Sequence, residues 1–288
     1  MTQLTDRLQR YSTALQMTPL GIALLLFLIG PIIVILITSF YKFNGFLTIP
    51  DVTVKNYVKL FTSGLTLDNY LETIRIAAIV WIVTAVLGFI IAYYLVFDVI
   101  SLRAKMLLFL LCVVPFWTSG VIRMIAWIPF LGKEGVINRV FMSIGIKDEP
   151  LEFLLFSEFA VILSYVHVFT LFMVAPLFNT MARIDPSLIE AARDNGAKGW
   201  QILLHVIIPL CKPGIAIGTI FVLSLTLSDF TAVRLLSGAN VGTVALSISN
   251  QIGSYNFAYS SANSLFLLIV LLLIVGGIMR LVDVRKQL

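Results

Sequence analysis

Long apolar runs alternate with short polar segments along this chain of 288 residues. A helix needs about 20 mostly apolar residues to cross the roughly 30 Å hydrocarbon core of a bilayer. Segments of this length predict six transmembrane helices, at about 19–40, 71–97, 104–128, 160–181, 214–236 and 262–282. Pro115 interrupts the third segment, and serine, threonine and aspartate punctuate the fifth. The pattern therefore predicts an all-α polytopic membrane protein.

Composition supports a membrane protein over a soluble one. Only 12% of residues are charged, whereas soluble domains carry about 25%, and the mean hydropathy is +1.01. The net charge of +5 could suggest a nucleic-acid partner, but the basic residues lie in short loops beside apolar runs. Such loops set membrane topology and attract anionic lipid headgroups. We therefore expect membrane lipid, and no nucleic acid, as a partner.

Two cysteines, Cys112 and Cys211, are far apart and predict neither a disulfide framework nor a metal site. At the N-terminus, residues 1–18 place leucines and a tyrosine on one helical face, which predicts a cytoplasmic amphipathic segment on the membrane surface. The run that follows is too long for a signal-peptide core, so we expect it to be retained as the first transmembrane helix. Residues 19–288 are then predicted to form a single transmembrane domain.

Lysine and arginine are unequally divided between the two sides of the membrane. The N-terminus, residues 98–105, residues 182–213 and the C-terminal tail hold eleven basic residues, and the longer loops on the other side hold six among many acids. The positive side is cytoplasmic. We therefore expect a multi-pass protein of the bacterial inner membrane with both termini, and the loop 182–213, in the cytoplasm.

The loop 182–213 carries signals for two helices. Asp185-Pro186 is a strong helix start, and Asn195-Gly196 is a matching stop, because glycine readily adopts the left-handed conformation after a helix end. A second amphipathic helix is predicted to end at Pro209. Its predicted apolar stripe consists of Trp200, Leu203, Leu204, Ile207 and Ile208.

The first of these helices has features of a docking surface. Leu188, Ala191 and Ala192 form a narrow face of small and medium side chains that another protein could approach closely. Glu190 and Arg193 can fix the register of such a contact by charge complementarity. On these grounds alone, a solvated connector between two membrane helices stays open as an alternative.

The spacing of this loop resembles a known motif. Glu190-Ala191-Ala192, then Gly196, then Val206-Ile207-Ile208-Pro209, resembles the EAA motif of ABC importer permeases, although isoleucine and leucine are commoner at positions 206 and 208. The resemblance implies a type I (MetI-like) permease fold. It also implies that the helix carrying Leu188, Glu190, Ala191, Ala192, Arg193 and Gly196 docks on a cytoplasmic ATPase.

The resemblance extends to nearly the whole chain. The stretch LLFLLCVVPFWTSGVIR (107–123) resembles the third helix of permeases for spermidine and putrescine. SDFTAVRLLSG (228–238) and ISNQIGSYNFAYSSA (248–262) resemble the end of the fifth helix and the next loop in that group. Related permeases for iron, thiamine, opines, phosphonates or amino-acid derivatives share similar layouts. A polyamine is the expected solute, and another small solute is the alternative.

Polar residues in the membrane segments are candidates for the translocation path. Asp229 is expected within the fifth helix, beside Ser228 and Thr231, and a charge at the centre of a membrane helix costs about 2.5–3.5 kcal/mol on insertion scales. Its carboxylate could line a path for a cationic amine. Alternatively it could form a structural ion pair with one of three arginines: Arg75, Arg123 or Arg234.

Two aromatic residues follow the proline of the third helix. Phe116 and Trp117 could attract an ammonium group through their ring faces, or could simply pack or form an interfacial belt. Arg123 and Arg234 would repel a polyamine, so we expect them to gate the path or hold an acid.

The resemblance also implies partners. The chain has no G-x-x-x-x-G-K-[ST] loop, so it is expected to be no enzyme and to bind no cofactor. ATP and Mg would be bound by two copies of a cytoplasmic ABC ATPase. The other expected partners are a second permease subunit, either a paralogue or another copy of this chain, and a periplasmic or lipid-anchored binding protein. Transport would proceed by alternating access.

Two other function classes are less well supported. An ion-coupled secondary transporter could use Asp229 as its cation site, but it would need no ATPase-docking loop. An intramembrane enzyme would need a nucleophile with a base, and the chain has no G-x-S-x-G motif.

Overall fold

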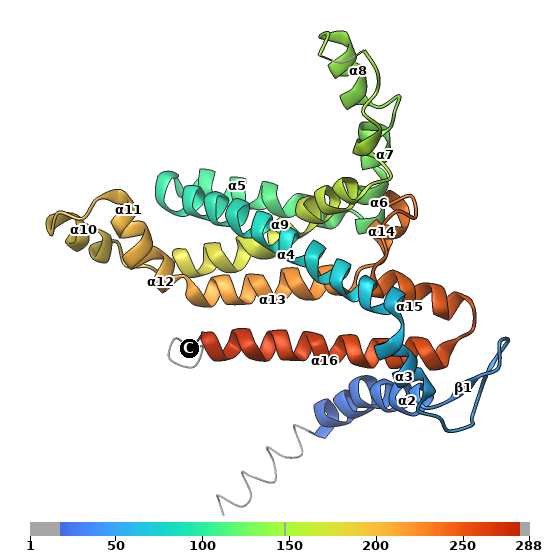
Figure 1. Cartoon of the computed structure of the whole chain (residues 1–288). Coiled ribbons are helices and arrows are strands. Elements are labelled where there is room, and N and C mark those ends of the chain that lie inside the picture. The colour runs from blue at the N-terminus through green and yellow to red at the C-terminus, as the bar shows by residue number, and fades with distance from the viewer. Residues whose placement is uncertain (1–17, 147, 283–288) are drawn as a thin grey trace, which may run out of the picture. The chain divides into compact units, whose positions relative to one another are not determined.

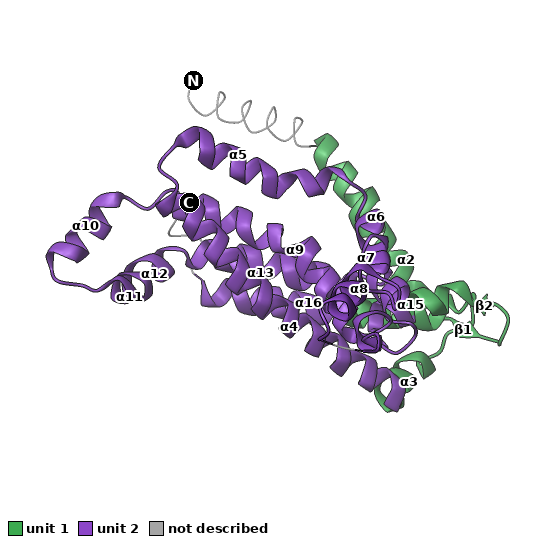
Figure 2. Ribbon diagram, turned by 90° about the horizontal axis from the view of Figure 1, so that it is seen from above, with its two compact units in different colours: residues 1–63, 248–268 green, residues 64–247, 269–288 purple. Residues whose placement is uncertain are grey.

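A computed structural model describes residues 18–146 and 148–282. The predicted amphipathic segment at residues 1–18 lies outside the described residues, apart from Thr18. The chain divides into two compact units, drawn in green and purple in Figure 2: Met1–Ser63 with Ile248–Leu268, and Gly64–Ser247 with Ile269–Leu288. The single transmembrane domain expected from the sequence stays a prediction.

The first unit is built around the first long helix of the chain. The helix Thr18–Ser39 includes the π-helix η1 (Leu25–Ile29) and α2 (Gly30–Ser39). A two-stranded antiparallel hairpin follows, with Lys42 opposite Ile49 and Phe43 opposite Thr48. Its remaining elements are β1 (Lys42–Phe43), β2 (Thr48–Ile49), α3 (Lys55–Thr62) and parts of α15 (Val244–Gly253) and α16 (Phe257–Leu281).

The second unit contains most of the helices, and α15 and α16 each contribute residues to both units. In chain order its other elements are α4 (Gly64–Tyr93), η2 (Tyr94–Asp98), α5 (Leu102–Val113), η3 (Val114–Trp117), α6 (Gly120–Ile125), α7 (Trp127–Leu131), α8 (Val136–Ser143), η4 (Glu152–Leu154), α9 (Glu158–Met181), α10 (Pro186–Asp194), α11 (Gly199–Ile202), η5 (Leu203–Ile207), α12 (Ile208–Leu210), α13 (Lys212–Ser228) and α14 (Thr231–Leu236).

The core of this unit is a bundle of α4, α9 and α13, which lie side by side (Figure 1). Small residues let these helices approach closely. A Cβ atom on Gly88 of α4 would lie 2.7 Å from Met173 Cγ, and one on Gly214 of α13 would lie 2.7 Å from the Pro176 carbonyl oxygen. Gly214 and Gly218 have the G-x-x-x-G spacing that brings helix backbones together in membranes. The core is therefore packed through glycines, a signal that the hydropathy pattern does not reveal.

The predicted all-helical membrane architecture is confirmed. Among the described residues, four helices are long and apolar enough to span a membrane, and two bent helix pairs bring the number to as many as six. One bent pair, Leu102–Trp117 with Gly120–Ser143, turns by 95°. The break follows Pro115, which cannot donate a backbone hydrogen bond. The other pair, Gly199–Leu210 with Lys212–Ser228, bends by 67°.

The expected continuous helix 214–236 is wrong. α13 ends at Ser228, Asp229 and Phe230 lie outside any helix, and α14 begins at Thr231. The Asp229 carboxylate explains the break, because Oδ1 accepts a hydrogen bond of 2.9 Å from the Ala232 backbone N–H at the start of α14. Aspartate side chains compete with the backbone in this way and favour helix starts over helix interiors.

Candidate functional site

Helix α10 begins at the predicted start signal. Asp185 is extended and its carboxylate accepts a hydrogen bond of 2.9 Å from the Ser187 backbone N–H, while Pro186 occupies the first helical turn. Hydrogen bonding from the Ser187 backbone and then its side chain lowers the pKa of Asp185. The cap is therefore ionised at neutral pH, where a negative charge also suits the helix N-terminus.

The same helix ends in a complete Schellman motif. The N–H of Gly196 donates to the Arg193 carbonyl (2.9 Å), and the N–H of Ala197 donates to the Ala192 carbonyl (3.0 Å). Gly196 has φ +79°, and a Cβ added there would meet nothing within 4 Å. Glycine is therefore required at position 196 by the backbone conformation and not by lack of space.

The two faces of α10 differ in exposure. Glu190, Ala191 and Arg193 are exposed, and Leu188 is 47% exposed. Ala192 is half-buried and packs with Ile189 against the hydrophobic core. The predicted docking face of Leu188, Ala191 and Ala192 is therefore divided. The outward surface is formed by Leu188, Glu190, Ala191 and Arg193, while Ala192 attaches the helix to the bundle.

The predicted apolar stripe of the second loop helix is only partly buried against the bundle. Trp200 and Leu204 are 58% and 51% exposed, whereas Ile207 and the unpredicted Ile202 are buried. The π-helix η5 explains the difference, because its wider turn shifts the inward face relative to the spacing of an α-helix. Figures 1 and 2 show that α10 and α11 extend beyond the ends of α9 and α13.

A second polar site lies at the break between α13 and α14. The hydroxyl of Tyr165, on α9, donates to Asp229 Oδ1 (3.1 Å) and lies within 3.2 Å of the Asp229 carbonyl oxygen. Tyr165 is 1% exposed, and Asp229 is half-buried. Ser228 is turned back onto its own helix by a 2.8 Å bond to the Ser224 carbonyl, and Thr231 opens α14. Asp229 is thus held by a side chain far away in sequence.

The arginines near this break lie over aromatic rings. The Arg123 guanidinium lies 5.3 Å from the centre of the Phe116 ring, and that of Arg234 lies 5.2 Å from the Phe230 ring. Phe116 also packs edge-on against Phe172. α14, which carries Arg234, packs against α6, which carries Arg123, and against α9. One face of Phe116 therefore already holds a cation.

Trp117 differs from its neighbour. Its side chain is 79% exposed, and it ends the short helix η3. That exposure at the bend between α5 and α6 fits an interfacial position better than a packed one.

Known proteins resemble this chain over nearly its whole length. It is 32% identical to the spermidine/putrescine transport system permease protein PotB of Escherichia coli, over 92% of this chain and 94% of that protein. The PotB protein of Haemophilus influenzae is also 32% identical, over 88% and 87% of the two chains. This chain belongs to the ABC importer permease family.

A further relative and a solved structure are also similar to this permease. The inner membrane ABC transporter permease protein YdcU of E. coli is 29% identical over 91% of the chain. A crystal structure of a bacterial ABC transporter involved in alginate import matches with a TM-score of 0.78 and 20% identity, covering 98% of each chain, which establishes the fold alone. No protein-family model matches the chain.

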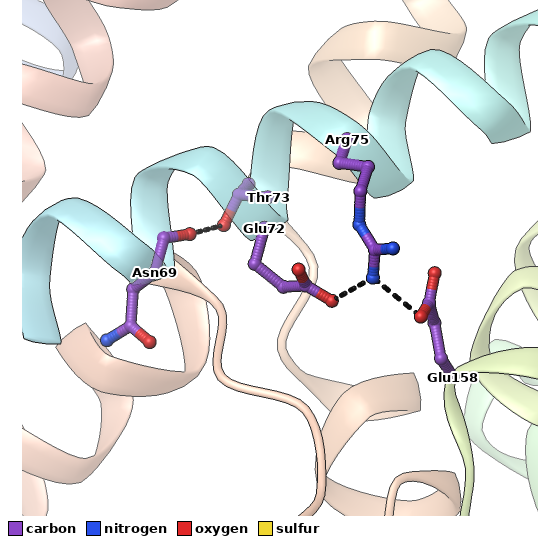
Figure 3. A network of polar contacts seen from close by, with 5 residues as sticks. All are labelled: Asn69, Glu72, Thr73, Arg75 and Glu158. Atoms are coloured by element: carbon purple, nitrogen blue, oxygen red, sulfur yellow. Dashed lines mark hydrogen bonds and ion pairs between the residues drawn. The ribbon is translucent and has the colours of Figure 1, made fainter.

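The permease also contains a polar network that the sequence did not reveal. One Arg75 nitrogen bonds to Glu72 on its own helix and to Glu158 on α9, at 2.6 Å each (Figure 3). Nearby, the Thr73 hydroxyl donates to the Asn69 carbonyl and accepts from the Val244 backbone N–H. Arg75, one of the three arginines considered as alternative ion-pair partners of Asp229, is therefore paired with two glutamates instead. Only the i, i+3 spacing of Glu72 and Arg75 could have hinted at the network.

Within residues 18–146 and 148–282, no three His, Cys, Asp or Glu side chains lie close enough to hold a metal ion.

Proposed function

We propose that this permease carries a polyamine such as spermidine or putrescine into the cytoplasm. The observation that carries the proposal is the 32% identity to PotB proteins over about nine-tenths of the chain. Of the stretches that resemble polyamine permeases, 107–123 includes part of α6, which packs against α14, and 228–238 spans the α13–α14 break itself. The Asp229 carboxylate at this break carries the charge that a cationic amine would need, which supports the proposal.

Energy for transport enters through α10. The helix is capped at both ends, exposes Leu188, Glu190, Ala191 and Arg193, and is anchored by Ile189 and Ala192. A helix that is capped and anchored in this way can move as a rigid body and transmit the movement of a bound protein to the bundle, whereas an uncapped loop would deform. The partner that binds α10 is a cytoplasmic ABC ATPase. Two copies of this ATPase bind ATP and Mg in the complete importer.

Complete transport requires further chains. A second permease subunit, either a paralogue or another copy of this chain, supplies the other half of the path. A periplasmic or lipid-anchored binding protein delivers the solute. Both termini and α10 face the cytoplasm, and closure of the ATPases rocks the two permease halves between inward-open and outward-open states.

Asp229 is the carboxylate that meets the amine. Its Oδ1 accepts hydrogen bonds from Tyr165 and Ala232, which fixes the carboxylate in place to accept a further hydrogen bond from a cation. Such a charge-assisted bond contributes about 1.5–3 kcal/mol. Phe116, Trp117, Ser228 and Thr231 line the approach, and Arg123 and Arg234 act as gating or charge-balancing groups.

A second candidate solute is a zwitterion or anion, such as an opine, a phosphonate or another amino-acid derivative. The observation that favours it is the position of Arg123 and Arg234 on the neighbouring helices α6 and α14. In that case Asp229 would have a structural role, and Arg123 or Arg234 would bind the solute.

Uptake by the complete importer in proteoliposomes separates these candidates. Labelled spermidine should accumulate only with ATP and binding protein present, and excess putrescine should compete while an opine should not. If the importer hydrolyses ATP and transports another solute but no polyamine, the polyamine assignment falls and the permease family stands. Uptake driven by an ion gradient without ATP would instead support a secondary transporter.

A further inference from the structure

An open apolar cavity of about 370 Å³ lies within the second unit, between α4, α13 and the C-terminal half of α16. From Lys212 to Leu223 the lining of α13 runs about 16 Å at 1.5 Å per residue, so the cavity is elongated along the helices. The α16 side contributes aliphatic residues, including Ile274, Ile278 and Leu281.

The wall offers almost nothing to a polar solute. Two of its polar side chains satisfy each other, since the Trp81 indole N–H donates to the Thr219 hydroxyl at 2.9 Å. Except for Lys212, the other lining residues are aliphatic. An apolar slot that is open on one side and has no unmet hydrogen-bond groups favours a hydrocarbon chain.

Lys212 marks one end of this slot. Its side chain is exposed at the first residue of α13, and none of the ion pairs among the described residues engages it. It lies in the segment 182–213, which carries much of the positive charge of its side of the membrane. A cation at the membrane surface beside a hydrocarbon slot matches an anionic phospholipid in both charge and shape.

We propose that the cavity between α4, α13 and α16 binds one anionic phospholipid, with an acyl chain in the slot and its phosphate on Lys212. The site is independent of the transported solute. Because Lys212 directly follows the loop of α10–α12, the bound headgroup would lie at the base of the coupling helix. It would thus support that loop where it joins the bundle.

Native mass spectrometry of the purified importer complex tests the proposal. The complex, containing this chain at full length, is exchanged into detergent with equal amounts of phosphatidylglycerol and phosphatidylcholine, and the retained lipids are counted. Phosphatidylglycerol should be retained in preference. Lys212→Gln should reduce that preference about fivefold, which corresponds to one basic side chain at an anionic surface.

Two further variants locate the site. Arg103→Gln removes an exposed cation on α5, outside the cavity, and should leave the preference unchanged. Ile278→Trp fills the slot from a half-buried position and should remove the retained lipid while the complex still elutes as a single assembled species. Equal retention of both lipids by the natural protein, or an unchanged preference in Lys212→Gln, would overturn the proposal. So would a cross-link from position 278 to the second permease subunit in place of lipid.

Discussion

Gly196 lies within the loop 182–213 and Gly214 directly follows it, yet glycine is required at each for a different physical reason. Gly196 has open space around it but a φ of +79°, which side chains rarely adopt. Gly214 lies in the first turns of α13, where a Cβ would clash with the Thr180 hydroxyl and the Pro176 carbonyl of α9. The loop is therefore shaped by its own sequence, and the bundle by contacts between distant segments.

The bundle should be the more sensitive of the two regions. Gly214→Leu forces α13 away from the α9 backbone, and overpacking of this kind typically costs about 1–3 kcal/mol or more. We expect a markedly lower thermal midpoint in detergent and little assembled importer. Gly276→Leu is the matched control, because a Cβ at Gly276 meets nothing within 4 Å. Equal effects of the two substitutions would contradict close packing at Gly214.

The break at Asp229 tests whether a tertiary contact also serves transport. Asp229→Asn keeps an oxygen for Tyr165 and Ala232 but removes the charge, so spermidine uptake should fall about tenfold, equivalent to about 1.4 kcal/mol, with the fold preserved. Tyr165→Phe removes the buried hydroxyl and should cost about 1 kcal/mol of stability, with a smaller effect on uptake. Stability and uptake are measured on the same purified complexes.

The reverse result at this site is equally informative. If Asp229→Asn lowers stability and leaves uptake unchanged, the carboxylate is structural, and the arginines become the candidates for solute contact.

The smallest expected effect is that of pH on the α10 cap. The pKa of Asp185 is lowered by hydrogen bonds from Ser187, so the cap stabilises the helix above the ordinary value of 3.8 and loses this contribution as pH falls below it. Hydrogen exchange of the α10 amides, corrected for intrinsic rates, should show reduced protection only below that pH. Asp185→Asn caps without titrating and should remove the pH dependence.

Features set by neighbouring residues could be predicted from the sequence, whereas those set by contacts between distant segments could not. The caps Asp185 and Gly196 were predicted correctly because their signals lie within a few residues of the helix they bound. Long apolar runs likewise predicted the membrane helices. At Asp229 the local cap on Ala232 was missed, and the Tyr165 hydroxyl that also holds this carboxylate lies on another helix.

Other features were also beyond the sequence. The burial of Ile202 beside the π-helix η5 was not predicted, because local propensity does not encode the extra residue in a π-helical turn. The pairing of Arg75 with Glu158 joins α4 to α9 across a long stretch of chain. For Tyr165 and Glu158 the missing information was which helices are neighbours, and not the preference of any one residue.

Coupling through α10 is tested most directly by measuring spermidine uptake per ATP hydrolysed by the complete importer in proteoliposomes. Gly196→Pro forces a negative φ and removes the N–H that bonds to Arg193, whereas Gly199→Ala alters an unstrained glycine with open space. If α10 couples the ATPase to the bundle, Gly196→Pro should insert normally and hydrolyse ATP but transport at least about tenfold less per ATP, which corresponds to about 1.4 kcal/mol of coupling. Gly199→Ala should stay coupled. Normal coupled uptake in Gly196→Pro would contradict coupling through α10.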